Sequence, residues 1–225
     1  MLPEAGSQHR KLICIPIIHN QADMGGLSES VKRASVKRIG RIGWKRKLDL
    51  IDQFWSEIEK ALERLPIPFD RVRIYQDGLP VSGREADIVR ELAEAGSRNH
   101  ALLLRLMDKG AKLMGTESLE LLLQEYEAMR RSLGVGERPN GKPRERPGPV
   151  VHGASYAERW KRAAPPQRER DPVLESRDRF IAERINRTLQ PGEVGIVFLG
   201  MLHDLKPWLA KDIEVTYPVH GPARR

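Results

Sequence analysis

The chain has 225 residues, a length that suits one sizeable core, and only 5% of them are aromatic, so this core should be mainly aliphatic. No apolar run approaches the roughly 20 residues needed to span a bilayer, and the N-terminal sequence lacks the apolar stretch of a secretory signal. These features argue against membrane insertion and favour a cytoplasmic protein. The single cysteine, Cys14, excludes an intramolecular disulfide, in agreement with a reducing compartment.

The net charge of +8 is concentrated in one segment. Residues 32–47 carry eight basic and no acidic side chains, while the remaining 31 basic residues balance the 31 acidic ones. Such a patch can bind phosphates or an anionic surface, whereas a dispersed excess mainly affects solubility. The eight cations of this basic segment are Lys32, Arg33, Lys37, Arg38, Arg41, Lys45, Arg46 and Lys47.

The first elements of the chain are a strand and a long helical region. The apolar residues 11–18 predict a buried strand that ends at His19. Ser28 is placed to cap a helix that carries the basic segment, and Gly40 and Gly43 are expected to interrupt this helix. Apolar residues then recur at helical spacing over residues 47–65, which predicts an amphipathic helix.

The middle of the chain predicts two more strands and several helices. Residues 71–78 alternate apolar and polar side chains, which favours a half-exposed or edge strand that ends at Asp77. Two helical segments precede a short strand at residues 109–117, which ends in Glu117. The next helix is amphipathic. Its expected inward stripe consists of Leu119, Leu122, Tyr126, Met129 and Leu133.

The composition then changes to Gly, Pro, Arg and Glu, and we interpret residues 134–172 as a flexible insertion. A further helix at 177–189 leads into an apolar strand that delivers His203. Residues 212–219 form the last, edge strand, because Pro218 cannot serve a central ladder. We therefore expect residues 1–133 and 173–225 to complete one domain.

Strands that alternate with helices predict a single-domain α/β fold. We expect a largely parallel or mixed central sheet with helices on both faces and a C-terminal edge strand. Ligands of such sheets bind outside the carboxyl ends of the strands. The four central strands end in His19, Asp77, Glu117 and His203, so these side chains should converge on one rim.

Two imidazoles and two carboxylates at one rim suit a divalent metal with an activated water, and without a metal they suit general acid–base chemistry. Polar residues also end strands simply because solvent begins there. The basic segment has two interpretations as well. It can hold nucleic acid or another acidic partner, or it can be a solvated helix face beside an anionic substrate.

Two stretches resemble the TraB/PrgY/Tiki family, which belongs to a broader group with ChaN-like and erythromycin esterase-like proteins. Residues 200–203, Gly-Met-Leu-His, match the Gly-x-x-His motif that occurs twice in this family. Residues 177–185, which begin with Arg177, resemble the family's arginine-containing helix before its second motif. The first motif would fall at residues 16–19, where Pro16 replaces the glycine.

The resemblance implies a compact α/β fold in which two motif histidines, a glutamate and an arginine share a pocket. In Tiki-like members this pocket supports metal-dependent peptide hydrolysis. Carried over to this chain, the resemblance points to His19, His203 and Arg177. Glu117 is the chosen counterpart of the glutamate, in preference to Asp77. Membrane-bound members carry transmembrane segments, and this sequence has none.

The leading hypothesis is therefore a metal-dependent hydrolase of peptide or ester bonds that acts on a peptide or small molecule. His19 and His203 would bind the divalent metal, Glu117 and Asp77 would be catalytic, and Arg177 would stabilise negative charge in the transition state. The alternative is a non-enzymatic regulatory or binding protein that uses the basic segment to hold an anionic partner such as nucleic acid. A scaffold that has lost its activity is a third interpretation, and the sequence pattern carries no signal for the oligomeric state.

Overall fold

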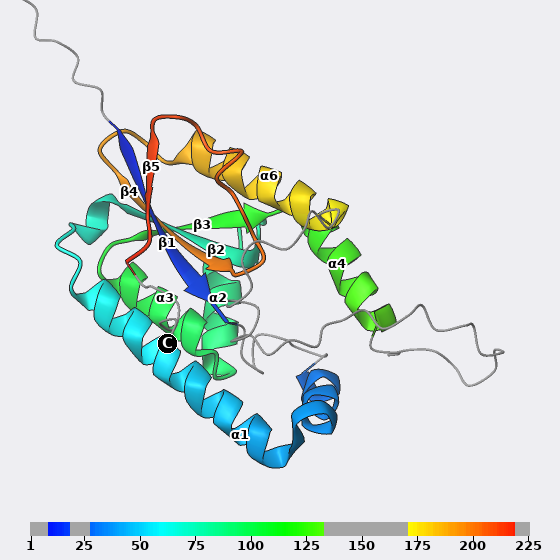
Figure 1. The fold of residues 1–225 in the computed structure, drawn as a ribbon. Coiled ribbons are helices and arrows are strands. Elements are labelled where there is room, and N and C mark those ends of the chain that lie inside the picture. The colour runs from blue at the N-terminus through cyan, green and yellow to red at the C-terminus, as the bar shows by residue number, and fades with distance from the viewer. Residues whose placement is uncertain (1–8, 19–27, 133–170, 219–225) are drawn as a thin grey trace, which may run out of the picture.

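A computed structural model describes residues 9–18, 28–132 and 171–218. Its centre is one five-stranded sheet with the order β3-β2-β4-β1-β5, in which all neighbouring strands are parallel (Figure 1). This confirms the predicted α/β fold and the edge position of the last strand. The strands are β1 (Arg10–Ile17), β2 (Val72–Pro80), β3 (Lys112–Glu117), β4 (Val194–Gly200) and β5 (Ile213–Thr216).

Helices cover both faces of the sheet. On β1, Ile13 and Ile15 pack in a core with apolar residues of α1 and α3, whereas Leu12 and Cys14 pack in a second core with α6. This alternation follows from the two-residue period of a strand. None of the described helices combines membrane-spanning length with an apolar sequence. The helices are α1 (Ser28–Glu63), the 3₁₀ turn η2 (Phe69–Arg71), α2 (Glu85–Glu94), α3 (Arg98–Asp108), α4 (Leu119–Ser132) and α6 (Pro172–Thr188).

The helix α1 has a kink at Gly40, where φ is 71° and ψ is 170°. Only glycine adopts this left-handed backbone without strain, so the predicted interruption is confirmed at Gly40. The interruption predicted at Gly43 was wrong, because this residue has helical backbone angles. After the kink, the apolar stripe predicted over residues 47–65 faces the core, and Trp55 and Ile58 are fully buried. Glu59 on the same helix accepts hydrogen bonds from Arg98 of α3, which ties the two helices together.

The strand β2 is central, so the prediction of an edge or half-exposed strand was wrong. It pairs with β3 on one side and with β4 on the other. Several of its polar residues are buried instead of facing solvent. Arg73 forms an ion pair with Glu193, and Gln76 and Asp77 are buried. The polar residues of this alternating sequence therefore lie in the interior and not on a solvent-exposed face.

The predicted inward stripe of the helix after β3 was also wrong for most of its residues. On α4, Leu119 is 59% exposed, Tyr126 is 42% exposed and Met129 is 39% exposed, while Leu133 lies outside the described residues. The helix contacts α6 and β2, and Leu122 is the only residue of the predicted stripe that is half-buried among those described, together with its neighbours Leu121 and Glu125. Apolar spacing identified the helix but not the direction of its packing.

The expected insertion at residues 134–172 lies outside the described part of the chain, apart from its last two residues. These two residues begin α6, because Asp171 is the N-cap and Pro172 is the first helical residue. The Asp171 carboxylate accepts a hydrogen bond from the backbone N–H of Val173 at 2.9 Å. The predicted start of the C-terminal part at residue 173 is therefore close to the observed start of the helix.

Candidate functional site

The carboxyl ends of three adjacent strands bring together three of the four expected rim residues. Asp77 lies in the C-terminal part of β2, which continues to Pro80 and not only to Asp77 as predicted. Glu117 is the last residue of β3, and His203 lies in the turn that follows β4. One ligand atom of each residue can be chosen so that all three atoms lie within 4.8 Å of one another. His19, the fourth expected residue, lies outside the described residues.

Arg177 of α6 holds the carboxylates of this rim together. Its Nη2 donates to Asp77 Oδ1 at 2.6 Å and to Glu117 Oε1 at 2.7 Å, and its Nε donates to Glu117 Oε2 at 3.3 Å. Its Nη1 donates to Glu125 Oε2 on α4 at 2.5 Å. The Arg177 side chain is only 5% exposed. One guanidinium thus links the ends of β2 and β3 to two helices.

His203 is fixed by a second carboxylate of α6. Asp178 Oδ1 accepts a hydrogen bond from His203 Nδ1 at 2.6 Å, and Asp178 Oδ2 accepts one from the backbone N–H of Asp204 at 3.1 Å. This pairing sets the orientation of the ring and leaves its Nε2 3.4 Å from Asp77 Oδ2. Asp178 therefore positions both the imidazole and the turn that carries it.

The Asp77 carboxylate also joins neighbouring strands. Its Oδ2 accepts a hydrogen bond from the backbone N–H of Gly200, the last residue of β4, at 2.9 Å. The backbone N–H of Gly78 donates to Glu117 Oε1 at 3.4 Å. Each carboxylate of the pair is thus held by Arg177 and by a backbone amide at the same rim, which limits the movement of its oxygens.

Burial and charge shift the pKa values of three groups in the cluster. Burial raises the pKa of Glu117 to about 7, even though the hydrogen bonds and charge of Arg177 act in the opposite direction. Burial lowers the pKa of His203, but the hydrogen bonds with Asp178 and Asp77 outweigh it and raise the value to about 9. The pKa of Arg177 is raised by the surrounding carboxylates, against the effect of its burial.

Asp178 and Glu125 also belong to the cluster, although neither was predicted as a site residue. Asp178 had a detectable signal, because Arg177 and Asp178 occupy inward positions of the same helical stripe as Ile181 and Ile185. Charged residues on an apolar stripe indicate buried ionic partners. Glu125 had no such signal, since acidic residues are frequent along the whole of α4.

The donor set of Asp77, Glu117 and His203 fits a divalent metal. Carboxylate oxygens and an imidazole nitrogen are ligands that Zn²⁺, Mn²⁺ and Fe²⁺ accept. In a tetrahedral site with bonds of about 2.0–2.2 Å, two ligand atoms lie about 3.3–3.6 Å apart, so the three donors would have to move together by up to about 1.5 Å. The three residues could hold a metal after this movement and after His203, whose pKa is raised to about 9, has released its proton.

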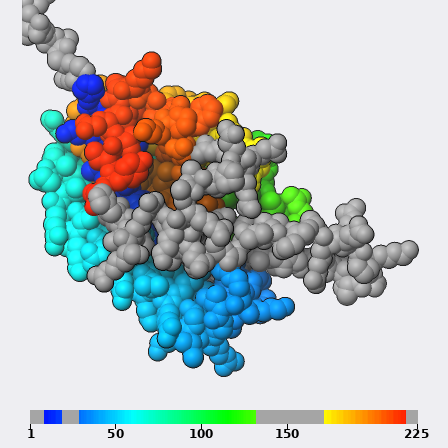
Figure 2. Space-filling view, in the orientation of Figure 1, coloured from blue at the N-terminus to red at the C-terminus, as the bar shows by residue number. Residues whose placement is uncertain are grey.

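The basic segment lies on α1, on both sides of the Gly40 kink, and Figure 2 shows the blue part of this helix at the surface. Six of its eight cations are exposed, and Lys32 and Lys47 are half-buried. The Lys47 ammonium lies over the Trp44 ring at 5.2 Å, and burial lowers its pKa. Ile42, among these cations, is 74% exposed.

Comparisons with known protein families, with curated proteins and with solved structures found no match. The resemblance to the TraB/PrgY/Tiki family therefore rests on residues 16–19, 177–185 and 200–203, and it stays a hypothesis. The geometry of the cluster carries the functional argument independently of this resemblance.

Proposed function

We propose that this protein is a divalent-metal-dependent hydrolase of peptide or ester bonds, of the TraB/Tiki type, with the metal held by Asp77, Glu117 and His203. The observation that carries the proposal is the convergence of these three donors from the ends of three adjacent parallel strands. Ligands of open α/β sheets bind at this edge. The proposed ligand set differs from the sequence hypothesis, in which His19 accompanied His203.

The bound metal would polarise the substrate carbonyl and lower the pKa of a bound water. The chain's own residues prepare the site. Asp178 binds Nδ1 of His203, so Nε2 of the ring is directed at Asp77. In metal sites, a carboxylate bound to the second ring nitrogen orients a ligating histidine in this way. Glu117 is held by two N–H groups of Arg177. The positions of the donors are thus set by buried neighbours.

Arg177 is a positioning residue in this proposal. A guanidinium has five N–H donors, and Arg177 directs four of them at Asp77, Glu117 and Glu125. These contacts keep two acidic side chains close together despite their mutual repulsion. The stabilisation of transition-state charge by Arg177 stays a prediction.

The test compares two carboxylates that both bind Arg177. We expect the purified wild-type protein to bind one equivalent of Zn²⁺ or Mn²⁺ in calorimetry. Glu117→Gln should weaken this binding about tenfold or more, because a ligand is lost. Glu125→Gln is the matched control and should leave the affinity within about threefold, because Glu125 contacts Arg177 outside the ligand group.

Hydrolysis of mixed peptide and ester substrates should be lost after chelation and return when the metal is added. Circular dichroism should show that both variants keep the wild-type fold. The proposal fails if the wild-type protein binds neither metal, or if Glu117→Gln and Glu125→Gln bind it equally well. Either outcome would leave the cluster with a purely structural role.

A second candidate function, nucleic-acid binding, is supported by the exposure of the basic segment. Each phosphate contact releases counterions, so the logarithm of the affinity should fall with the logarithm of the salt concentration. The variant for this test replaces four exposed cations by glutamine, namely Lys37, Arg41, Lys45 and Arg46. The control replaces four exposed arginines elsewhere, namely Arg84, Arg90, Arg131 and Arg187.

Fluorescence anisotropy with duplex DNA measures the binding. The variant in the basic segment should reduce the salt slope by up to about 0.9 for each lost phosphate contact, whereas the control should keep the wild-type slope. Absence of wild-type binding at low salt, or an equal loss in both variants, would contradict this function.

A further inference from the structure

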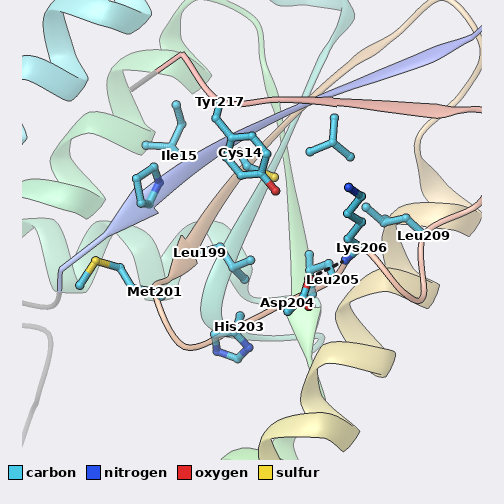
Figure 3. Close-up of a pocket in the computed structure, with 13 residues that line it drawn as sticks. Cys14, Ile15, Leu199, Met201, His203, Asp204, Leu205, Lys206, Leu209 and Tyr217 are labelled. Atoms are coloured by element: carbon cyan, nitrogen blue, oxygen red, sulfur yellow. Dashed lines mark hydrogen bonds between the residues drawn. The ribbon is translucent and has the colours of Figure 1, made fainter. Parts of the chain in front are cut away.

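A cavity of about 400 Å³ lies at the same rim of the sheet, and Figure 3 shows His203 of the ionic cluster among the residues that line it. It is formed by the carboxyl-terminal parts of β1 and β4, by residues 201–209 and by residues of and just after β5. The volume is within the range of roughly 300–1,000 Å³ that is usual for small-molecule sites. His203 lines this cavity and is also a member of the cluster.

The walls of the cavity are mainly aliphatic. Ile15, Pro16, Leu199, Met201, Leu209 and Val215 line it. Cys14 also lines it, but burial raises the pKa of this thiol to about 12, so the thiolate is not available as a nucleophile. The charged residues of the lining, His203, Asp204 and Lys206, lie on one loop. A wall of this kind favours an uncharged apolar group.

We propose that this cavity binds an aliphatic group of the substrate, carried either as the acyl part of an ester or as the side chain next to a scissile amide. The inference rests on the proposed hydrolase function. It follows from the double position of His203, which lines the cavity and belongs to the cluster, so a chain in the cavity can carry its carbonyl group beside His203. The cavity would thus select the substrates whose carbonyl reaches the cluster from the His203 side.

Binding can be measured without any catalysis. In full-length protein labelled with ¹³C-methyl methionine, the Met201 signal is identified by its absence from Met201→Leu. Titration with octanamide, a neutral straight-chain amide, should shift the Met201 signal, and acetamide should not. Met129 is exposed on α4 and does not line the cavity, so its methyl signal is an internal control that should not shift.

A variant that fills the cavity gives the second arm. Val215→Trp should weaken octanamide binding about tenfold or more, since an indole takes the space of the ligand. Leu123→Trp is the matched control, because Leu123 is 54% exposed on α4. Wild-type affinity in an alkyl amide series should rise up to about fourfold for each methylene group that enters the cavity.

The kinetic arm uses p-nitrophenyl esters from acetate to octanoate. The value of kcat/KM should rise with chain length for the wild-type protein and remain flat for Val215→Trp. If octanamide shifts Met201 while no ester or peptide is hydrolysed, the cavity assignment holds and the proposed function fails. If esters are hydrolysed without any chain-length preference and Met201 does not shift, the cavity assignment is overturned and the hydrolase function remains.

Discussion

Replacement of Arg177 by methionine should lower the free energy of unfolding by about 3–5 kcal/mol, as expected when one member of a buried ionic cluster is removed. The guanidinium is the cation between Asp77 and Glu117, whose side chains are 3% and 0% exposed. Methionine keeps an apolar side chain of similar length but leaves both carboxylates without the guanidinium. Urea denaturation at neutral pH measures the effect.

Two further variants show whether the loss comes from unpaired charge. Arg177→Met combined with Glu117→Gln should regain part of the stability, since one buried carboxylate is removed with the cation. Arg179→Met is the control on the same helix. Arg179 is exposed, and its guanidinium lies over the Trp208 ring at 4.4 Å. Loss of this contact should lower the free energy of unfolding by about 1 kcal/mol or less. Similar losses for Arg177→Met and Arg179→Met would contradict the prediction.

Replacement of Trp55 by alanine should lower the free energy of unfolding by about 3–5 kcal/mol. The indole is 1% exposed and lies in the core formed by α1, α3 and one face of the sheet. Alanine removes most of this apolar contact and leaves a cavity that the neighbouring helices can only partly close. Thermal or urea unfolding measures the change.

The phenylalanine variant at the same position separates packing from hydrogen bonding. Trp55 Nε1 is buried and has no hydrogen-bond partner among the described residues, so Trp55→Phe loses no polar contact within them and should cost less than about 2 kcal/mol. Leu50→Ala provides the control on the same helix, because Leu50 is 64% exposed and its loss should stay within about 0.5 kcal/mol. A loss for Trp55→Ala no larger than that of Leu50→Ala would contradict the assignment of this core.

Several features of the fold follow from local sequence patterns. The apolar runs around Cys14 and Val197 predicted strands, and the structure pairs them as central neighbours β1 and β4. The spacing of Ile51, Trp55 and Ile58 predicted both the helix and its buried face. These predictions succeeded because buried aliphatic side chains recur at the spacing of the secondary structure, about every 3.6 residues in a helix and every second residue in a strand.

The rim was predictable for a related reason. Parallel strands end at one edge of the sheet, so the residues that follow them converge. Asp77, Glu117 and His203 were all identified from strand ends, and the structure brings them together. The role of Asp178 was not predicted. This residue acts through hydrogen bonds with His203 and Asp204, which are distant from it in the sequence.

The sequence by itself therefore determined the fold class, the central apolar strands and three residues at the rim. Only the tertiary structure decided that β2 is central, that α4 exposes Tyr126 and Met129, and that Arg177 joins Asp77 to Glu117. The cavity beside His203 also appears only in three dimensions. The physical reason is that periodicity reports how one element divides its polar and apolar faces, whereas ionic partners and cavities depend on the relative positions of several elements.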